Sequence, residues 1–255
     1  ITYESFEKFT ESSLKTLAKE TAVALLCKGG VWPQLIQRPF GIVANPQDSP
    51  KAIFISGFDT NPLSPDYAFT LKGEEKYFQA GVLVLQKLTS GKVHLGLELD
   101  AEIAPVFANV QGVQVNKFSG QHPAGNVGIH IHHIDPINKG EIIWTISPFG
   151  VVQIGKLFIE GKYDASKIVA VTGSEAKIAA YAKTFIGACV DTLVNGNIKN
   201  DHIRVVSGNV LTGEKISSDG YLGYYANQIT LIPEGDYEEF LGWLKPSSTK
   251  LSFHK

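Results

Sequence analysis

Hydrophobic and polar positions alternate between a helical and a strand period along the first half of the chain. In residues 12–28 apolar side chains recur at steps of three and four, which predicts a surface helix ended by the glycine pair at 29–30. Residues 52–56 form an apolar run typical of a buried strand, and residues 74–90 show the helical period again. Residues 93–99 alternate weakly, as a strand does.

After the second of these strands, residues 101–109 are predicted to form a helix. A short strand is predicted next, at Val113 and Val115. Strand, helix, strand, helix and strand in succession predict a parallel sheet wound with crossover helices. Residues 32–50 contain four prolines, so we expect an ordered loop there rather than a regular element.

The pattern changes after residue 150. Residues 151–159 have one apolar face and are followed by Gly161, which predicts a helix and its C-cap. Short β runs then follow at 168–171, 203–206 and 228–232, with a short helix expected between the first two near 189–193. We therefore expect a domain boundary between residues 140 and 165 and a small α+β module after it.

Composition and charge exclude several classes of protein. The 255 residues carry 23 Lys and Arg against 25 Asp and Glu, a net charge of −2, so no basic surplus points to a nucleic-acid partner. No apolar run reaches the 18 or more residues of a spanning helix. The two cysteines, Cys27 and Cys189, are too few for an iron–sulfur cluster, and we expect Cys27 to lie in the core. A start at Ile1 without any Met is typical of an internal segment.

The most unusual segment, residues 119–136, holds four of the seven histidines. If it is extended, His130 and His132 point to the same face, which is a starting point for a metal site. Such a site needs a third ligand, which the sequence does not identify. The alternative is a set of packed or hydrogen-bonding histidines in a ligand-facing loop.

Complete catalytic motifs are absent from the sequence. No G-x-G-x-x-G follows a strand, and no G-x-S-x-G occurs. Residues 208–215 approach a phosphate-binding loop, but Glu214 stands where that loop needs lysine, so we expect a turn between strands. Gly57 to Pro65 form a turn-rich segment directly after a predicted strand, where α/β folds place ligand-facing groups.

Blocks of residues along nearly the whole chain resemble one family in order. They are Gly30-Val31-Trp32, Gln37-Arg38-Pro39-Phe40, Phe58-Asp59-Thr60-Asn61-Pro62-Leu63, Phe118 to Gly125, Gly128 to His132, Ile142 to Thr145, Ile154 to Phe158, Arg204 to Gly208 and Leu241-Gly242-Trp243. The chain resembles the NqrA subunit of the bacterial Na+-translocating NADH:quinone oxidoreductase (Na+-NQR). The resemblance is to an internal fragment, without the family's amino-terminal lipoyl-like domain and most of its carboxy-terminal region.

The resemblance implies an α/β fold class with two domains. A Rossmann-like parallel-sheet domain is expected over residues 1–150 and a connecting helix over 151–165. A β-grasp α+β domain of the soluble-ligand-binding type is expected over 166–235, followed by the start of a truncated C-terminal region over 236–255.

The same resemblance bears on cofactors. Relatives such as the flavin subunit of complex I hold FMN on a GGAGFP loop, and the matching place here is Gly29-Gly30-Val31-Trp32-Pro33. A bulky indole at Trp32 is expected to obstruct that loop. We therefore expect no flavin and no Fe–S cluster on this chain. FAD, FMN and Fe–S are implied for partner subunits of the complex.

The function implied is that of a peripheral subunit of a sodium-pumping NADH:ubiquinone reductase. It would dock on the membrane subunit NqrB at the cytoplasmic face of the bacterial inner membrane, would not be catalytic by itself, and has ubiquinone as a candidate ligand. The alternatives are a soluble metal-dependent hydrolase using His130 and His132, and an FMN-dependent NADH dehydrogenase subunit. The candidate quinone- or partner-facing residues are Phe58, Asp59, Thr60, Asn61, Ser119, His122, His130 and His132.

Overall fold

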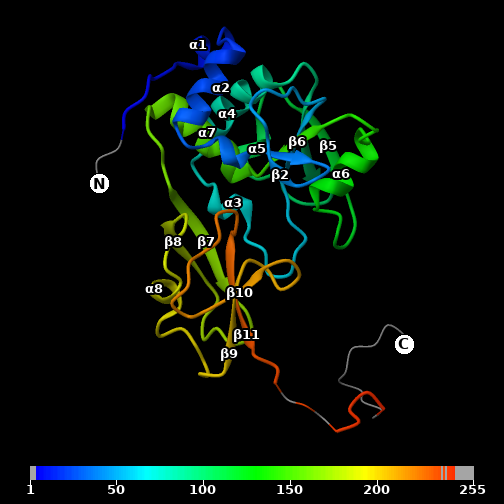
Figure 1. The fold of residues 1–255 in the computed structure, drawn as a ribbon, viewed down its shortest axis with the longest axis vertical. Helices are drawn as coiled ribbons and strands as arrows, with labels where there is room; N and C mark the ends of the chain where they lie inside the picture. The colour runs from blue at the N-terminus through cyan, green and yellow to red at the C-terminus, as the bar shows by residue number, and fades with distance from the viewer. Residues whose placement is uncertain (1–3, 237, 239, 245–255) are drawn as a thin grey trace.

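The computed structural model describes residues 4–236, 238 and 240–244, and Figure 1 shows two successive sheets with their helices. The expected carboxy-terminal region over 236–255 lies mostly outside these residues. The first sheet has six strands in the order β2-β1-β6-β3-β4-β5. Their bounds are Ile42–Val43, Ile36–Arg38, Ile143–Ile146, Ile53–Ser56, Val93–Glu98 and Gln114–Phe118.

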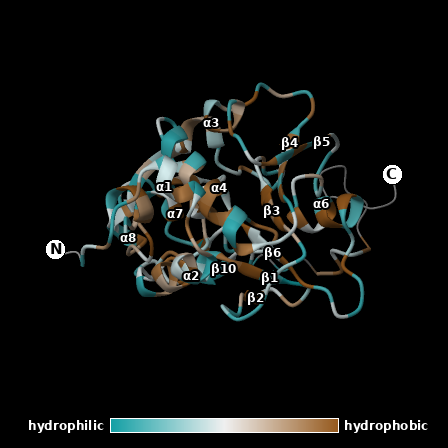
Figure 2. Ribbon diagram, turned by 90° about the horizontal axis from the view of Figure 1, so that it is seen from above, coloured by the Kyte–Doolittle hydropathy of each residue, from teal (hydrophilic) through white to brown (hydrophobic). Residues whose placement is uncertain are grey.

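Helices cover both faces of the first sheet. The helices of this first module are α1 (Glu11–Lys15), α2 (Lys19–Lys28), the 3-10 helix η1 (Trp32–Gln34), α3 (Tyr67–Thr70), α4 (Glu75–Leu88), α5 (Pro105–Ala108), α6 (Val127–Ile134) and α7 (Pro148–Glu160). Figure 2 shows β3, coloured hydrophobic, between α4 and α6. Ile53 and Ile55 belong to the core that includes α4 and α7, whereas Phe54 joins the smaller core with Ile131 of α6. Successive residues of a strand point to opposite faces, so β3 is buried on both.

The second sheet lies below the first in Figure 1 and has its own core. Its five strands run in the order β10-β9-β11-β7-β8, over Glu214–Ile216, Ile203–Ser207, Gln228–Pro233, Ser166–Thr172 and Ala180–Phe185, with the short helix α8 over Asp191–Val194. Only β11 and β7 pair in parallel. The predicted fold class is confirmed: a parallel-containing α/β sheet is followed by a small mixed α+β module.

The predicted loop over residues 32–50 is wrong in part. It contains η1 and the short strands β1 and β2, and β1 pairs antiparallel with β6. Pro33 and Pro39 flank β1 and lie outside it, so neither removes a donor from the ladder. The single helix over 12–28 is likewise two helices. The Thr16 hydroxyl donates to the Ser13 carbonyl and closes α1, as a side chain competing with the helix does.

Residues 127–134 of the histidine segment form a helix, so the extended geometry that would place His130 and His132 on one face does not occur. Val127, Ile131 and Ile134 belong to the core between α6 and the sheet, at a spacing of four and three that is also helical. Isoleucine and histidine alternate with the period of a strand over residues 129–132 only. Cys27 is exposed near the end of α2, so its predicted place in the core is also wrong.

The two modules are in direct contact. The Tyr225 hydroxyl, from the second module, donates to the Pro33 carbonyl at 2.8 Å. Gln228 Nε2 donates to the Pro62 carbonyl at 3.2 Å, and the Phe69 and Tyr181 rings stack with centroids 4.3 Å apart. Loops at one edge of the first sheet therefore face the second module. Across the described part of the chain, none of the helices is long and apolar enough to span a bilayer.

Candidate functional site

The first sheet has a reversal of strand order between β3 and β6. β4 and β5 continue from β3 to one side, while β6, which follows β5 in the chain, lies parallel to β3 on its other side. In open α/β sheets the loops leaving the carboxyl ends of two such strands part and leave a crevice. Here those ends are Ser56 and Ile146.

A cavity of about 470 Å³, which we call the switch-point pocket, lies at these strand ends. Its walls come from η1, β1, the loop after β3, the amino ends of α6 and α7, and the second module. The lining residues are Gln34, Ile36, Arg38, Ser56, Phe58, Asp59, Asn61, Tyr67, Gly125, Asn126, Val127, Gly128, Thr145, Ile146, Ser147, Pro148 and Tyr225. Its size lies within the usual range of small-molecule sites.

Arg38 supplies the positive charge of the switch-point pocket. Its Nε atom is buried and has no hydrogen-bond partner among the described residues. An unsatisfied buried donor of a charged group costs free energy, commonly more than 1 kcal/mol, unless a ligand or water completes it. The pocket thus contains a guanidinium with an unused donor.

The amino end of α6 adds backbone donors. Asn126 occupies the N-cap position but its side chain makes no capping hydrogen bond. The N–H groups of Val127 and Gly128, both lining residues, have no acceptor within the described segments. First-turn amides have no partner inside their helix and favour oxygen acceptors or anions. Donors therefore reach the cavity from two elements, β1 and α6.

His130 lies outside the switch-point pocket, between two aromatic rings. Phe118 stacks on it with centroids 3.9 Å apart and Phe58 with centroids 5.4 Å apart. Its Nε2 donates to the Ala124 carbonyl at 2.8 Å, and burial lowers the pKa of the imidazole. A side chain at Gly96 of β4 would collide with the ring. In this arrangement the buried His130 ring fastens α6 to the sheet.

Two other predicted residues join the loops to each other. Thr60 Oγ1 lies 3.2 Å from His122 Nδ1 and accepts the Gly125 N–H at 3.0 Å. Asp59 Oδ1 accepts from the backbone N–H of Asn61 at 2.8 Å and from its side-chain amide at 2.6 Å. The two contacts of Thr60 hold the loop after β3 against the loop before α6, whereas the bonds between Asp59 and Asn61 lie within the loop after β3.

The eight predicted site residues therefore separate into groups. Phe58, Asp59 and Asn61 line the switch-point pocket. Thr60 and His122 connect two of its walls, and His130 stacks between Phe58 and Phe118 behind it. Ser119 and His132 are exposed and belong to neither group, the His132 ring having an edge contact with His133. The role of all eight in ligand binding remains a prediction.

The metal-site hypothesis finds no support in this arrangement. On a helix His130 and His132 point in different directions, and the first is buried while the second is exposed. No group of three or more His, Cys, Asp or Glu side chains suited to a metal ion occurs within residues 4–236, 238 and 240–244.

Sequence reasoning did not identify Arg38, Val127, Gly128 and Ser147 as site residues. A signal existed for Ser147: Ser followed by Pro is a helix start, and its hydroxyl caps α7 by accepting the Gly150 N–H at 3.1 Å. No comparable signal marked Arg38, because its position depends on the pairing of β1 with β6.

The Trp32 side chain does not cover the glycine pair before it. It is 5% exposed, donates from Nε1 to the Ala44 carbonyl at 2.6 Å and packs edge-on against Trp144. The steric argument against a flavin at this loop is therefore wrong, because the indole points into the core. The expected absence of flavin stays a prediction on other grounds, namely the departure of the loop from the GGAGFP pattern.

The fold and the pocket define an α/β protein with a crevice at the switch point of its sheet, followed by a small mixed-sheet module. The same fold occurs in chains of two solved structures of NAD+-reducing [NiFe]-hydrogenase, in the H2-reduced and air-oxidised states. The TM-scores are 0.54 and 0.55 at 10% and 11% identity, over 91% and 92% of this chain and 52% of each of those chains. At this identity the likeness concerns the fold alone.

Family models give the narrower assignment. Residues 17–163 match the NqrA second alpha/beta domain, and residues 168–218 match the NQRA C-terminal domain. The chain belongs to the NqrA family, so the predicted resemblance is confirmed.

Two curated relatives illustrate the match, and both are NqrA subunits of a Na(+)-translocating NADH-quinone reductase. The relative from Alcanivorax borkumensis is 37% identical over 97% of this chain and 55% of its own length. The relative from Pasteurella multocida is 38% identical over 98% of this chain and 56% of its own length. The chain thus spans about half the length of the curated relatives it matches.

Proposed function

We propose that the chain is part of the NqrA subunit of a Na+-translocating NADH-quinone reductase and serves in assembly and docking within that complex. The observation that carries this proposal is the family match, in order, over residues 17–218. In the proposal the chain lies peripherally at the cytoplasmic face of the bacterial inner membrane, against the membrane subunit NqrB. The flavins and the Fe–S centre belong to partner subunits, and this chain does not catalyse the reaction by itself.

Co-purification tests the docking role. A tagged form of the full-length protein that contains this chain is expected to retain the membrane subunits and NADH-quinone reductase activity after detergent extraction. A tagged soluble protein of similar size, expressed with the same subunits, is the control and should retain neither. Failure of the full-length protein to associate with a membrane flavoprotein complex would contradict the proposal.

We further propose that the switch-point pocket takes the ring of a quinone. Ile36, Phe58, Tyr67 and Ile146 offer apolar and aromatic surface, and a quinone needs in addition donors to its two carbonyl oxygens. Arg38 has an unused buried donor, and the amino end of α6 has unpaired amides. Both kinds of group suit a neutral acceptor whose carbonyls become more negative on reduction.

Replacing Arg38 by alanine is expected to weaken binding of a short-chain ubiquinone at least tenfold, since hydrogen bonds to charged groups contribute about 1.5–3 kcal/mol. Quenching of intrinsic fluorescence measures the affinity. Arg204→Ala is the matched control, because the chain's other arginine pairs with Glu234 in the second module, 3.0 Å away, and does not line the pocket. Equal affinity in the two variants would exclude Arg38 from quinone binding.

A further inference from the structure

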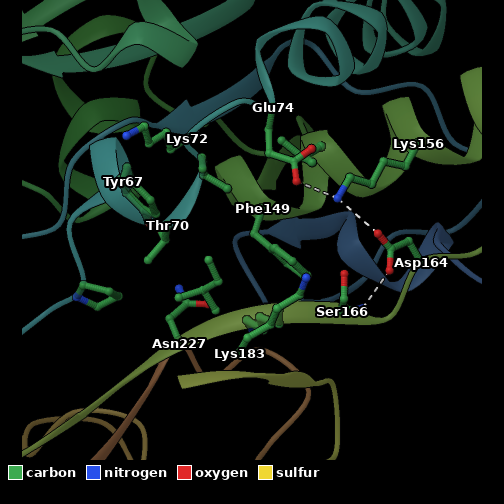
Figure 3. Close-up of a pocket in the computed structure, with 15 residues that line it drawn as sticks. Tyr67, Thr70, Lys72, Glu74, Phe149, Lys156, Asp164, Ser166, Lys183 and Asn227 are labelled. Atoms are coloured by element: carbon green, nitrogen blue, oxygen red, sulfur yellow. Dashed lines mark hydrogen bonds and ion pairs between the residues drawn. The ribbon is translucent and has the colours of Figure 1, made fainter. Parts of the chain in front are cut away.

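A second cavity lies where the two modules meet, and Figure 3 shows it in close-up. It has a volume of about 330 Å³, and we call it the interface pocket. Its walls come from α3 and the segments on either side of it, from α7 and the segment after it, from strands β7 and β8, and from Asn227. The lining residues are Pro65, Tyr67, Thr70, Leu71, Lys72, Glu74, Phe149, Val152, Lys156, Asp164, Ser166, Lys167, Ile168, Lys183 and Asn227.

Both carboxylates of the interface pocket are already paired. Figure 3 shows Lys156 between them, with Nζ 2.7 Å from Glu74 and 3.1 Å from Asp164. Three further lysines line the cavity, at 72, 167 and 183, and none has a carboxylate within ion-pair distance in the part of the chain that the structure describes. Four lysines therefore face two carboxylates, and the walls carry an excess of two positive charges when Lys167 is protonated.

Lys167 is the unusual member of this set because it is buried, with 4% of its surface exposed. Its Nζ donates to the Ala226 carbonyl at 2.7 Å and lies 4.8 Å from the centroid of the Phe149 ring. An ammonium has three donors, and no other acceptor for it occurs among the described residues. A carbonyl and a ring face only partly compensate a buried cation.

A purely structural role does not account for this lysine well. The hydrogen bond from β7 to the Ala226 carbonyl requires one donor only. A neutral side chain would supply that donor without burying a charge. Burial lowers the pKa of Lys167 to about 7, which reflects the missing anion. Groups with such a shift beside a cavity are enriched at functional sites.

The rest of the cavity wall suits the body of a small molecule. Phe149, Leu71, Val152 and Ile168 offer apolar surface, and Tyr67 adds a further ring. Lys72 and Lys183 are exposed residues of the wall and are available to a second acidic oxygen. The cavity thus combines an apolar lining with a concentrated positive charge.

We propose that the interface pocket is a binding site for a small organic anion, whose acid group pairs with the Lys167 ammonium and whose apolar body packs on Phe149. The acid group is a phosphate ester or a carboxylate. The site is separate from the switch-point pocket, so this proposal does not depend on quinone binding.

Two probes test the site and distinguish the acid groups. Phenyl phosphate and benzoate share a ring, and benzyl alcohol is the neutral control. The first readout is the ¹³Cε signal of Lys167 in protein labelled at lysine, followed from pH 5 to 11. A bound anion favours the protonated amine, so we expect at least a tenfold rise in its proton affinity with one or both probes and none with benzyl alcohol.

The second readout is probe affinity in variants, by calorimetry. Lys167→Met is expected to lower the affinity at least tenfold, and Lys139→Met, at an exposed lysine remote from the pocket, to leave it unchanged. The probe that binds more tightly identifies the acid group. Circular dichroism verifies that each variant is folded. If Lys167→Met does not fold, the titration of Lys167 in the parent chain tests the anion site.

Three outcomes would overturn the proposal. The first is a Lys167 titration that neither probe changes at concentrations up to about 10 mM, the weakest affinity of interest. The second is binding that survives Lys167→Met. The third is binding lost in Arg38→Ala instead, which would place the anion in the switch-point pocket.

Discussion

Replacing Gly155 by alanine is expected to lower the free energy of unfolding by about 3 kcal/mol, because the added methyl group has no space. Gly155 lies in α7, and its Cβ would overlap the backbone carbonyl of Tyr77 in α4. Gly81 of α4 is in the reciprocal position, since a Cβ there would overlap the Val151 carbonyl of α7. Neither obstacle is a flexible side chain, so the two helices must move apart.

Urea denaturation followed by circular dichroism measures this effect. Gly128→Ala is the matched control, since it also lies in a helix but a methyl group there meets nothing within 4 Å. The control is expected to be neutral or to stabilise by up to about 1 kcal/mol, because alanine favours helix over glycine. A change of less than about 0.5 kcal/mol for Gly155→Ala would show that the helix contact is loose.

Replacing Lys167 by methionine is expected to stabilise the chain by several kcal/mol at pH 6. The pKa of Lys167 falls from 10.5 to about 7 in the folded chain because of burial, a difference that corresponds to roughly 5 kcal/mol. The lost hydrogen bond to Ala226 offsets about 1 kcal/mol of that gain. Methionine fills similar space without a charge.

The pH dependence has a definite sign. Between pH 7 and 10.5 the unfolded chain binds a proton at Lys167 that the folded chain has released, so folded stability rises with pH in that window. Below pH 7 the full cost is present. The difference in unfolding free energy between Lys167→Met and the parent chain should therefore shrink as pH rises from 7 to 10.

Denaturant titrations at pH 6, 8 and 10 provide the measurement, with Lys139→Met as the exposed-lysine control. Other groups titrate in both proteins and cancel in the difference. A difference that stays constant with pH would mean that Lys167 keeps its proton in the folded chain. Stabilisation at pH 6 together with loss of anion binding would identify Lys167 as a group that weakens the fold for the sake of a ligand.

The local pattern of apolar and polar residues is sufficient to predict an element that is long or buried on both faces. α4 repeats its apolar stripe over 14 residues, and β3 is an uninterrupted apolar run, so the pattern predicts both near their observed bounds. β1 and β2 have three and two residues, too few for a period, and they exist because β1 pairs with β6 more than a hundred positions later. The alternation of histidine with isoleucine at α6 is compatible with an extended segment, and the helix there was not predicted.

The residues of the candidate site likewise include some that the sequence predicts and others that it does not. Phe58, Asp59 and Asn61 are predictable because they follow a strand whose carboxyl end had to lie at the ligand edge of a parallel sheet. Arg38 is not predictable as a site residue, since its guanidinium reaches the cavity through the antiparallel addition of β1. The domain limits and the cofactor assignments made from the family resemblance stay predictions.

The sequence by itself determined the class of fold, the family and the place of the loop after β3 beside the crevice, because these depend on short-range periodicity and on ordered blocks of residues. Only the tertiary structure decided which charges are buried and unpaired. In the sequence Lys167 is a single polar residue at the start of a short β run. Its amine becomes buried beside a cavity only when β7 packs against Phe149 of α7. The solvation of a charge depends on everything around it, and most of those neighbours are remote in sequence.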